Sequence, residues 1–268
     1  MTTARPIVGV VPAAGRARRI SPMPCSKEIF PIGFRTDEHG QVRTQVVSHH
    51  LLAKFARAGA TRGYVVLRDG KWDIPAYFGD GHLVGLDLAY VVIPGSLGPP
   101  DTVDRAYSFV AGCDVVFGFP DILFGPDDVF EILLTKMREA KADLALGLYR
   151  AVNPQQMDMT QVDDRGRVGG MFLKPKETDL RYGWLCAAWS PNFTEFLHGF
   201  VRGELNRQRE ASAYAGIDPQ GDLPMGAPIK AAIDAGLETC AVAFPESQYL
   251  DIGMPENLVD AMRGRAGL

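Results

Sequence analysis

The sequence contains few cysteines, and none of them lies close to another. The four in the chain are Cys25, Cys113, Cys186 and Cys240, and no CxxC pair occurs. Such spacing supports neither a zinc cluster nor a framework of disulfides. We therefore expect reduced thiols, as in a cytoplasmic protein.

Long apolar runs and an excess of basic residues are also missing. No run approaches the roughly 18 residues that a membrane span needs, and the first residues lack the apolar region of a signal peptide. Lys and Arg number 28 against 32 Asp and Glu, and this net charge of −4 excludes a global basic field for nucleic acid. We expect a cytoplasmic protein that binds neither nucleic acid nor a membrane.

Several familiar motifs are absent as well. GxGxxG would require glycines where Arg16, Ala17 and Arg18 stand, and neither GxxxxGK[ST] nor GxSxG occurs. These absences disfavour a dinucleotide site, a P-loop NTPase and a serine nucleophile. Two adjacent histidines, His49 and His50, would face different sides of a helix, so they make a poor pair of metal ligands.

Short apolar runs alternate with helical patterns through the first half of the chain. This alternation predicts a Rossmann-like α/β fold, with a mainly parallel sheet flanked by helices. Strands are expected at 6–11, 64–67, 88–93, 114–119 and 142–148, and helices at 46–58, 100–110 and 126–140.

The second half of the chain is less regular. The patterns there predict a turn at 163–166, strands at 184–189 and 238–244, helices at 191–201, 228–235 and 255–262, and a helix fragment with a loop over 204–220. The chain shows no linker and no repeat. We therefore expect a single domain over 1–268 with inserted β-elements.

The loop after the first predicted strand combines small residues with cations. Ala13, Ala14 and Gly15 end the strand, arginines follow at positions 16, 18 and 19, and Lys27 comes eight residues later. Small residues let backbone N–H groups approach a phosphate closely. Several cations at the carboxyl end of a parallel strand suit a triphosphate and a leaving pyrophosphate. A solvated basic loop is the plainer alternative.

Two aspartates follow predicted strands in distant parts of the chain. Asp121 comes just after a buried strand, and Asp251 stands between a strand and a helix start. Carboxylates at such positions can share one Mg²⁺, which keeps its other positions for water and phosphate. Each aspartate alone is more often a turn residue or a helix cap.

The ordered residues of this loop resemble a known family. Pro12-Ala13-Ala14-Gly15, Arg19-Ile20, Pro22, Lys27-Glu28 and Pro31-Ile32 resemble the signature loop of sugar-1-phosphate nucleotidyltransferases, especially UTP–glucose-1-phosphate uridylyltransferases and glucose-1-phosphate thymidylyltransferases. The resemblance implies that Arg19 contacts the triphosphate and that Lys27 contacts phosphates near the reacting centre. Phe119-Pro120-Asp121 resembles the LPD segment, and Leu250-Asp251-Ile252-Gly253 resembles the WxDxGT segment. The family aspartates hold the catalytic Mg²⁺, which implies catalytic Arg19, Lys27 and Asp121, and metal ligands Asp121 and Asp251.

The resemblance continues through the substrate-binding segments, with departures. Gly98 and Asp101 stand where the family reads the nucleobase, and Lys174 stands where a lysine binds the sugar phosphate. Leu173 replaces the glutamate that binds sugar hydroxyls. The remaining residues implied in substrate binding are Ala13, Ala14, Gly15, Arg16, Gly183 and Asp222.

The resemblance implies a Mg²⁺-dependent transfer of a nucleotidyl group from an NTP to a sugar-1-phosphate, giving an NDP-sugar and pyrophosphate. The NTP-binding half would span about 1–150 and the acceptor-binding half about 151–268. UTP or dTTP is favoured, CTP is compatible with Asp101, and a homo-oligomer is compatible with the family. One alternative is a cytidylyltransferase for a non-sugar phosphate, such as phosphocholine or an alditol phosphate, which Leu173 favours. Another is a catalytically silent regulatory relative that binds a nucleotide-sugar, which Ala17 and Leu173 permit.

Overall fold

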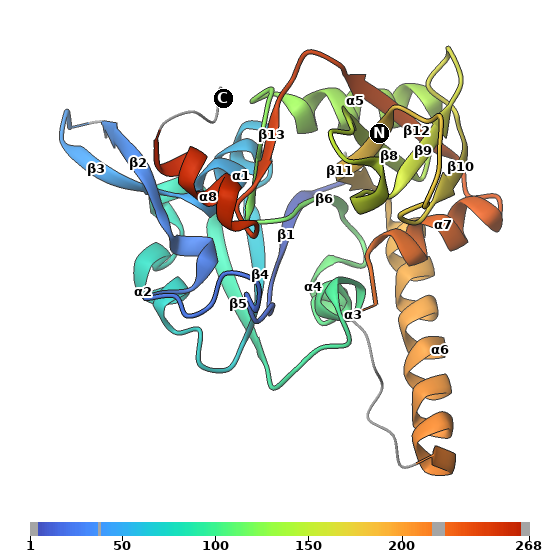
Figure 1. Ribbon diagram of the computed structural model, residues 1–268, viewed down its shortest axis with the longest axis horizontal. Helices are drawn as coiled ribbons and strands as arrows, with labels where there is room; N and C mark the ends of the chain where they lie inside the picture. The colour runs from blue at the N-terminus through green and yellow to red at the C-terminus, as the bar shows by residue number, and fades with distance from the viewer. Residues whose placement is uncertain (1–4, 37–38, 216–222, 264–268) are drawn as a thin grey trace.

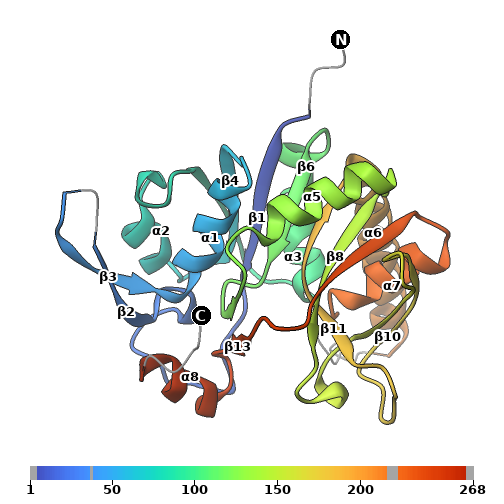
Figure 2. The same cartoon turned by 90° about the horizontal axis from the view of Figure 1, so that it is seen from above.

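A nine-stranded mixed sheet lies at the centre of the computed structural model, which describes residues 5–36, 39–215 and 223–263 (Figures 1 and 2). Four neighbouring strands run parallel, in the order β6 (Asp114–Gly118), β1 (Ile7–Ala13), β4 (Arg62–Arg68) and β5 (Asp87–Ile93). The carboxyl ends of all four therefore meet at one edge of the sheet.

The other half of the sheet is built around an antiparallel strand. β11 (Tyr182–Trp189) pairs antiparallel with both β6 and β8 (Leu144–Arg150), and β12 (Thr239–Phe244) pairs parallel with β8. A hairpin of β9 (Met159–Val162) and β10 (Val168–Phe172) joins at β11. The prediction of an α/β fold with a largely parallel sheet and inserted β-elements is confirmed.

Helices cover both faces of the sheet, because successive residues of a buried strand point to opposite sides. Val8 and Val10 of β1 join the cluster covered by α3 (Pro99–Asp104), α4 (Tyr107–Val110), α6 (Pro191–Ala215) and α7 (Gly226–Asp234). Val11 and Ala13 join the cluster on the other face, with α1 (Val47–Arg57), α2 (Asp73–Phe78) and α5 (Val129–Ala140).

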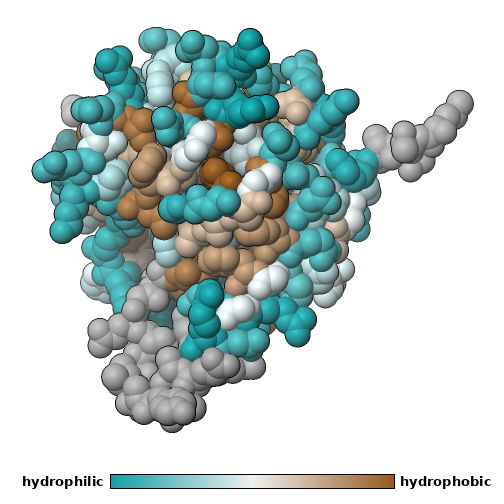
Figure 3. Space-filling view, turned by 90° about the vertical axis from the view of Figure 1, so that its right-hand side faces the viewer, coloured by the Kyte–Doolittle hydropathy of each residue, from teal (hydrophilic) through white to brown (hydrophobic). Residues whose placement is uncertain are grey.

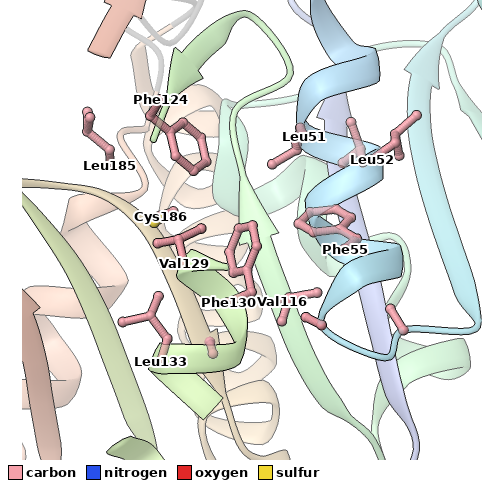
Figure 4. Packing of buried hydrophobic residues seen from close by; sticks show 14 of the residues in the cluster. Leu51, Leu52, Phe55, Val116, Phe124, Val129, Phe130, Leu133, Leu185 and Cys186 are labelled. Carbon is pink, nitrogen blue, oxygen red and sulfur yellow. The ribbon is translucent and has the colours of Figure 1, made fainter. Parts of the chain in front are cut away.

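The helices α1 and α5 meet over the sheet through their aromatic side chains. The rings of Phe55 and Phe130 lie 5.1 Å apart, edge to face, with Leu51 and Val116 beside them (Figure 4). A Cβ at Gly9 of β1 would lie 2.3 Å from the Phe55 ring. Glycine at this position therefore allows the ring to sit directly on the strand.

Two small two-stranded antiparallel sheets lie beside the central sheet. The hairpin of β2 (Pro31–Thr36) and β3 (Val42–Val46) forms one, and β7 (Ile122–Phe124) pairs with the distant strand β13 (Tyr249–Asp251) in the other. A separate small core joins these elements to α8 (Pro255–Met262) through residues such as Ile32, Leu123 and Ile252. The pairing of β7 with β13 brings a segment from near residue 250 next to the segment that follows β6.

Most predicted elements are confirmed, but several boundaries were wrong. The helix predicted at 100–110 is two short helices, and the helix predicted at 126–140 begins at Val129. The hairpin β2–β3 and the helix α2 were not predicted. The predicted turn at 163–166 is confirmed, with Gly166 at φ +78° and backbone N–H groups of Arg165 and Arg167 bound to Asp163.

Helix α6 differs from the prediction in its continuity. A helix was predicted over 191–201 and a helix fragment with a loop over 204–220, whereas the structure has one helix that continues to Ala215. Its carboxyl-terminal half extends beyond the rest of the molecule (Figure 1). The sequence from Asn206 onward is mostly polar, and a polar stretch gives no clear apolar period from which to predict a continuous helix.

The four cysteines are free thiols, as expected. Among the residues that the structure describes, no helix is both long and apolar enough to cross a membrane. The face on the α6 side of the molecule shows an apolar area bordered by hydrophilic residues (Figure 3). Exposed apolar atoms are common on folded domains.

A buried histidine gives the fold a predictable response to acid. His49 of α1 is 7% exposed, its Nδ1 has no hydrogen-bond partner, and burial beside Arg35 and His50 lowers its pKa to about 4. In the unfolded chain, His49 therefore binds a proton below about pH 6.5, whereas in the folded chain it stays neutral until the pH falls to about 4. The free energy of unfolding should fall by about 3 kcal/mol from this group as the pH drops from 7.5 to 4.

Urea denaturation at several pH values measures this effect. Comparing the protein with His49→Gln isolates the contribution, because the variant lacks the ionisable ring. We expect a smaller difference between pH 7.5 and pH 4.5 in the variant. An equal difference in both proteins would contradict the assignment.

Candidate active site

The central feature of the site is an ion pair between two loops that follow parallel strands. The loop after β1 leads to Lys27, which opens a short 3₁₀ helix, η1 (Lys27–Ile29), and the segment after β6 carries Asp121. The Nζ of Lys27 forms an ion pair and hydrogen bond with Oδ2 of Asp121, and both side chains are largely buried. Because β1 and β6 are neighbours in the sheet, their carboxyl ends bring the two residues together.

In this pair, each charged group stabilises the ionised form of the other. Burial raises the pKa of Asp121, but the ammonium of Lys27 outweighs it and leaves the carboxyl below its ordinary value. Burial lowers the pKa of Lys27, but Asp121 and Glu28 outweigh it and leave the amine above its ordinary value. Both groups are therefore ionised at neutral pH.

A second carboxylate reaches the same place from the far end of the chain. Asp251 lies opposite Ile122 in the two-stranded sheet of β7 and β13, and the N–H of Ile252 donates to the carbonyl of Asp121 at 3.0 Å. The N–H of Gly253 donates to Oδ1 of Asp251 at 2.8 Å. Burial and the nearby charge of Asp121 raise the pKa of Asp251. The two carboxylates are thus electrostatic neighbours, although 130 positions separate them in the printed sequence.

Gly253 lies beside a small space that the side chains of Asp121, Asp251 and Arg19 surround. A Cβ added there would lie 2.9 Å from Oδ1 of Asp251, 3.0 Å from Nη2 of Arg19 and 3.4 Å from Oδ2 of Asp121. Two carboxylates around one small space, each disfavouring the other's charge, form a donor set that fits Mg²⁺. Among the described residues, no histidine, cysteine or further acidic side chain forms a group of three ligands with these two aspartates. Water and phosphate would supply the other positions of such an ion.

One of the three arginines in the first loop reaches this space. Nη2 of Arg19 lies 3.7 Å from Oδ2 of Asp251, and its Nη1 donates to Sδ of Met254 at 3.0 Å. Arg16 and Arg18 are exposed on either side of Ala17, which holds a left-handed φ of +50°. Most of the Arg19 side chain is also exposed, so its guanidinium remains accessible to a ligand.

The small residues before the arginines lie close to Lys27. Ala13 and Ala14 are buried at the end of β1, while Gly15 is exposed. A Cβ on Gly15 would lie 3.9 Å from Nζ of Lys27. The backbone at Gly15 is therefore adjacent to the ammonium group, as an anion-binding loop requires.

A buried ion pair below the site was not found from the sequence. The Nζ of Lys71 contacts both carboxylate oxygens of Glu28, at 2.7 and 2.8 Å, and both side chains are almost fully buried. Asp73 also binds the N–H and hydroxyl of Ser26, at 2.6 and 2.8 Å. These contacts tie the segment around Lys27 to the start of α2. A single sequence gives no signal that pairs residues 43 positions apart.

Gly98 and Asp101 lie at the start of α3, where base recognition was predicted. Gly98 has φ +137°, and a Cβ there would lie 2.2 Å from the carbonyl oxygen of Leu223. Asp101 is 2% exposed and accepts from the N–H of Leu97 at 2.9 Å and from Nε of Arg105 at 3.1 Å. Both of its oxygens are thus engaged in holding the loop before α3.

The predicted acceptor residues lie beyond the same end of β6. Cys186 of β11 is opposite Gly118, and the two strands run antiparallel, so residues 183–185 lie next to residues 119–121. The Phe119 and Trp184 rings are 6.0 Å apart. A Cβ on Gly183 would lie 2.7 Å from the Met157 side chain, so glycine is required for this approach.

The remaining acceptor residues differ in how far the structure describes them. Lys174 is exposed, with a left-handed φ of +41°, and Leu173 beside it is 36% exposed. Asp222 lies outside the described residues. Asp158, between Met157 and β9, was not singled out from the sequence, which carries no local signal for it.

No family model matches the chain. It is 26% identical over 228 residues to the glucose-1-phosphate thymidylyltransferase of Streptomyces antibioticus, covering 83% of this chain and 58% of that protein. It is 25% identical over 172 residues to the low-salt glycan biosynthesis nucleotidyltransferase Agl11 of Haloferax volcanii, covering 63% of this chain and 45% of that protein. The chain thus spans about half the length of these curated relatives.

The fold has a counterpart among solved structures. A Bacillus anthracis protein assigned as a glucose-1-phosphate thymidylyltransferase, solved in complex with sucrose, matches with a TM-score of 0.76 and 15% identity. The match covers 98% of this chain and 96% of that one. The chain is thus similar in sequence to two proteins named as nucleotidyltransferases and shares the fold of a third protein assigned to the same kind of enzyme.

Proposed function

We propose that this chain transfers a nucleotidyl group from a nucleoside triphosphate to a sugar-1-phosphate, releasing pyrophosphate. The observation that carries the proposal is the meeting of Lys27, Asp121, Asp251 and Arg19 at the carboxyl ends of β1 and β6. Cations for a triphosphate and carboxylates for a metal are both needed for phosphoryl chemistry, and here they border one space. The names of the relatives support the same reaction class.

Asp121 and Asp251 would hold the Mg²⁺ ion of this reaction. When bound, the ion supplies positive charge that neutralises the phosphates and holds the α-phosphate near the acceptor phosphate. Lys27 stays beside Asp121 and presents its ammonium group to the reacting phosphate. Because the pKa of Lys27 is raised, it keeps its proton and acts by charge rather than as a base.

The other cations bind and orient the two substrates. Arg19 reaches the triphosphate from the exposed side of the site, with Arg16 near it and the backbone at Ala13, Ala14 and Gly15 below. Lys174 binds the phosphate of the acceptor. An oxygen of that phosphate attacks the α-phosphorus, the bond to pyrophosphate breaks, and no covalent enzyme intermediate forms. Positioning and charge stabilisation supply most of the rate in such transfers.

We assign recognition of the nucleobase to the loop at the start of α3. Since the Asp101 carboxylate is engaged with Leu97 and Arg105, it positions that loop, and the backbone near Gly98 faces the base. A backbone donor and acceptor suit the imide edge of uracil or thymine, so UTP or dTTP is favoured over CTP. Gly183 lets Met157 pack against β11 and so shapes the wall of the acceptor subsite. Asp222 is assigned to the acceptor as a polar group. A cytoplasmic enzyme and a homo-oligomer remain our predictions.

Pyrophosphate release tests the proposal. The purified chain is incubated with Mg²⁺ and each NTP, crossed with a panel of sugar-1-phosphates, alditol phosphates and phosphocholine. We expect turnover with one base and one sugar-1-phosphate, and its loss on addition of EDTA. Release that requires no acceptor, or no release in a protein that binds nucleotide, would contradict the proposal.

One observation favours a second candidate function. Leu173 is an apolar, partly exposed side chain beside Lys174, where a carboxylate for sugar hydroxyls is expected. A cytidylyltransferase for phosphocholine or an alditol phosphate would need no such carboxylate from this position. Turnover with CTP and one of these acceptors in the same panel would identify it. If the protein binds a nucleotide-sugar but catalyses no reaction in the panel, it is a catalytically silent relative.

A further inference from the structure

An unassigned carboxylate lies among the predicted acceptor residues. Asp158 precedes β9, its backbone carbonyl accepts from the N–H of Trp184 at 3.4 Å, and it interacts electrostatically with Lys174. Trp184 in turn lies beside Phe119, two residues from Asp121. Asp158 is thus joined by direct neighbours to both the acceptor lysine and the candidate metal site.

The absence of a side chain at Gly226 leaves space for the carboxylate of Asp158. A Cβ on Gly226, at the start of α7, would lie 2.1 Å from Oδ2 of Asp158 and 2.8 Å from Cδ2 of Leu173. A Cβ on Gly183 would lie 3.3 Å from the carbonyl oxygen of Asp158. The Asp158 carboxylate and the Leu173 side chain therefore meet at one point, beside Lys174.

The carboxylate is also incompletely satisfied. Oδ1 of Asp158 is buried and has no hydrogen-bond partner. Burial raises the pKa of Asp158, and hydrogen bonding to the Trp184 side chain and the Lys174 backbone only partly opposes this. Leaving a carboxylate oxygen without a donor costs free energy, so a native structure that keeps one needs an explanation.

We propose that Asp158 is a specificity-determining residue, whose carboxylate accepts a hydrogen bond from a hydroxyl or amino group of the acceptor. This proposal rests on the proposed function. The group that Leu173 cannot supply comes instead from the neighbouring strand. A carboxylate in this position selects acceptors that carry a hydrogen-bond donor at the facing position.

The test compares Asp158→Asn with Glu177→Gln, which removes an exposed carboxylate in the segment that follows Lys174. For Asp158→Asn we expect KM for the acceptor to rise at least tenfold, with KM for the NTP unchanged. The melting temperature should stay equal or rise, because the variant removes a charged group whose buried Oδ1 has no hydrogen-bond donor. Glu177→Gln should leave all three quantities unchanged. A lower melting temperature, with both KM values unchanged, would show a structural role and overturn the proposal.

Acceptor analogues identify the donor group. Removing the hydroxyl or amino group that faces Asp158 should weaken the wild-type reaction as much as Asp158→Asn does. The same analogue should cause no further loss in the variant, because the partner is already gone. A gain for amino over hydroxyl analogues that disappears in Asp158→Asn would identify a cationic donor. Equal losses in both proteins for every analogue would overturn the proposal.

Calorimetric binding separates this proposal from the proposed function. Titrating the acceptor phosphate into wild type and Asp158→Asn requires no turnover. Weaker binding to the variant alone supports the role of Asp158, even if pyrophosphate is never released. Equal binding to both proteins contradicts that role while leaving the transferase reaction intact. If the wild-type protein binds no phosphorylated acceptor, both proposals fail.

Discussion

Asp121→Asn should reduce turnover by about 10²-fold or more while the chain remains folded. The amide keeps the shape of the carboxylate but removes the charge that pairs with Lys27 and neighbours Asp251. Lys27 would then be a buried cation without its partner, and the candidate metal site would keep one carboxylate. The measurement is kcat for pyrophosphate release, corrected for the folded fraction from circular dichroism.

Asp164→Asn is the matched control, because Asp164 is an exposed aspartate in the β9–β10 turn. It should retain full turnover. If Asp121→Asn also turned over at a near-normal rate, Asp121 could not belong to the catalytic site. Loss of turnover that merely follows loss of folding would assign it a structural role.

Glu28→Gln should lower the free energy of unfolding by roughly 3 to 5 kcal/mol. Glu28 and Lys71 are both buried, and each carboxylate oxygen contacts the Lys71 ammonium. Replacing only the acid leaves a charged amine in a poorly solvated place, which costs more than the pair itself contributes. Urea denaturation with linear extrapolation measures the change.

The control is Asp234→Asn, which breaks the exposed pair between Lys230 and Asp234 within α7. Exposed pairs of this kind are worth little, so we expect a change of at most about 0.5 kcal/mol. Similar small effects for both variants would mean that the Glu28–Lys71 pair does not hold the segment around Lys27. A loss for Glu28→Gln that Lys71→Met then restores would support the pair directly.

The parallel half of the fold could be predicted because its strands are buried on both faces. Segments such as β1 and β6 read as continuous apolar runs, and the helices between them keep a 3.6-residue period. The hairpin β2–β3 was missed because its apolar residues form no buried run, and Phe34 and Val42 are among its exposed residues. The continuity of α6 was not predicted because its polar second half shows no clear apolar period.

The site could be predicted where its residues follow strands. Lys27, Asp121, Asp251 and Arg19 belong to ordered motifs, and the structure brings them together. Contacts between distant segments could not be predicted, as the pairing of Glu28 with Lys71 shows. The position of Asp158 beside Leu173 depends on the packing of α7 against the β9–β10 hairpin, which no local pattern encodes.

The destination of each phosphate tests the central claim most directly. The protein is incubated with Mg²⁺, the acceptor found in the panel, and NTP labelled with ³²P at either the α- or the γ-position. We predict that the α-label appears in the NDP-linked acceptor and the γ-label in pyrophosphate, with Asp121→Asn slowing both equally. A γ-label in the acceptor would indicate a kinase, and a γ-label in inorganic phosphate a hydrolase, and either result would contradict nucleotidyl transfer.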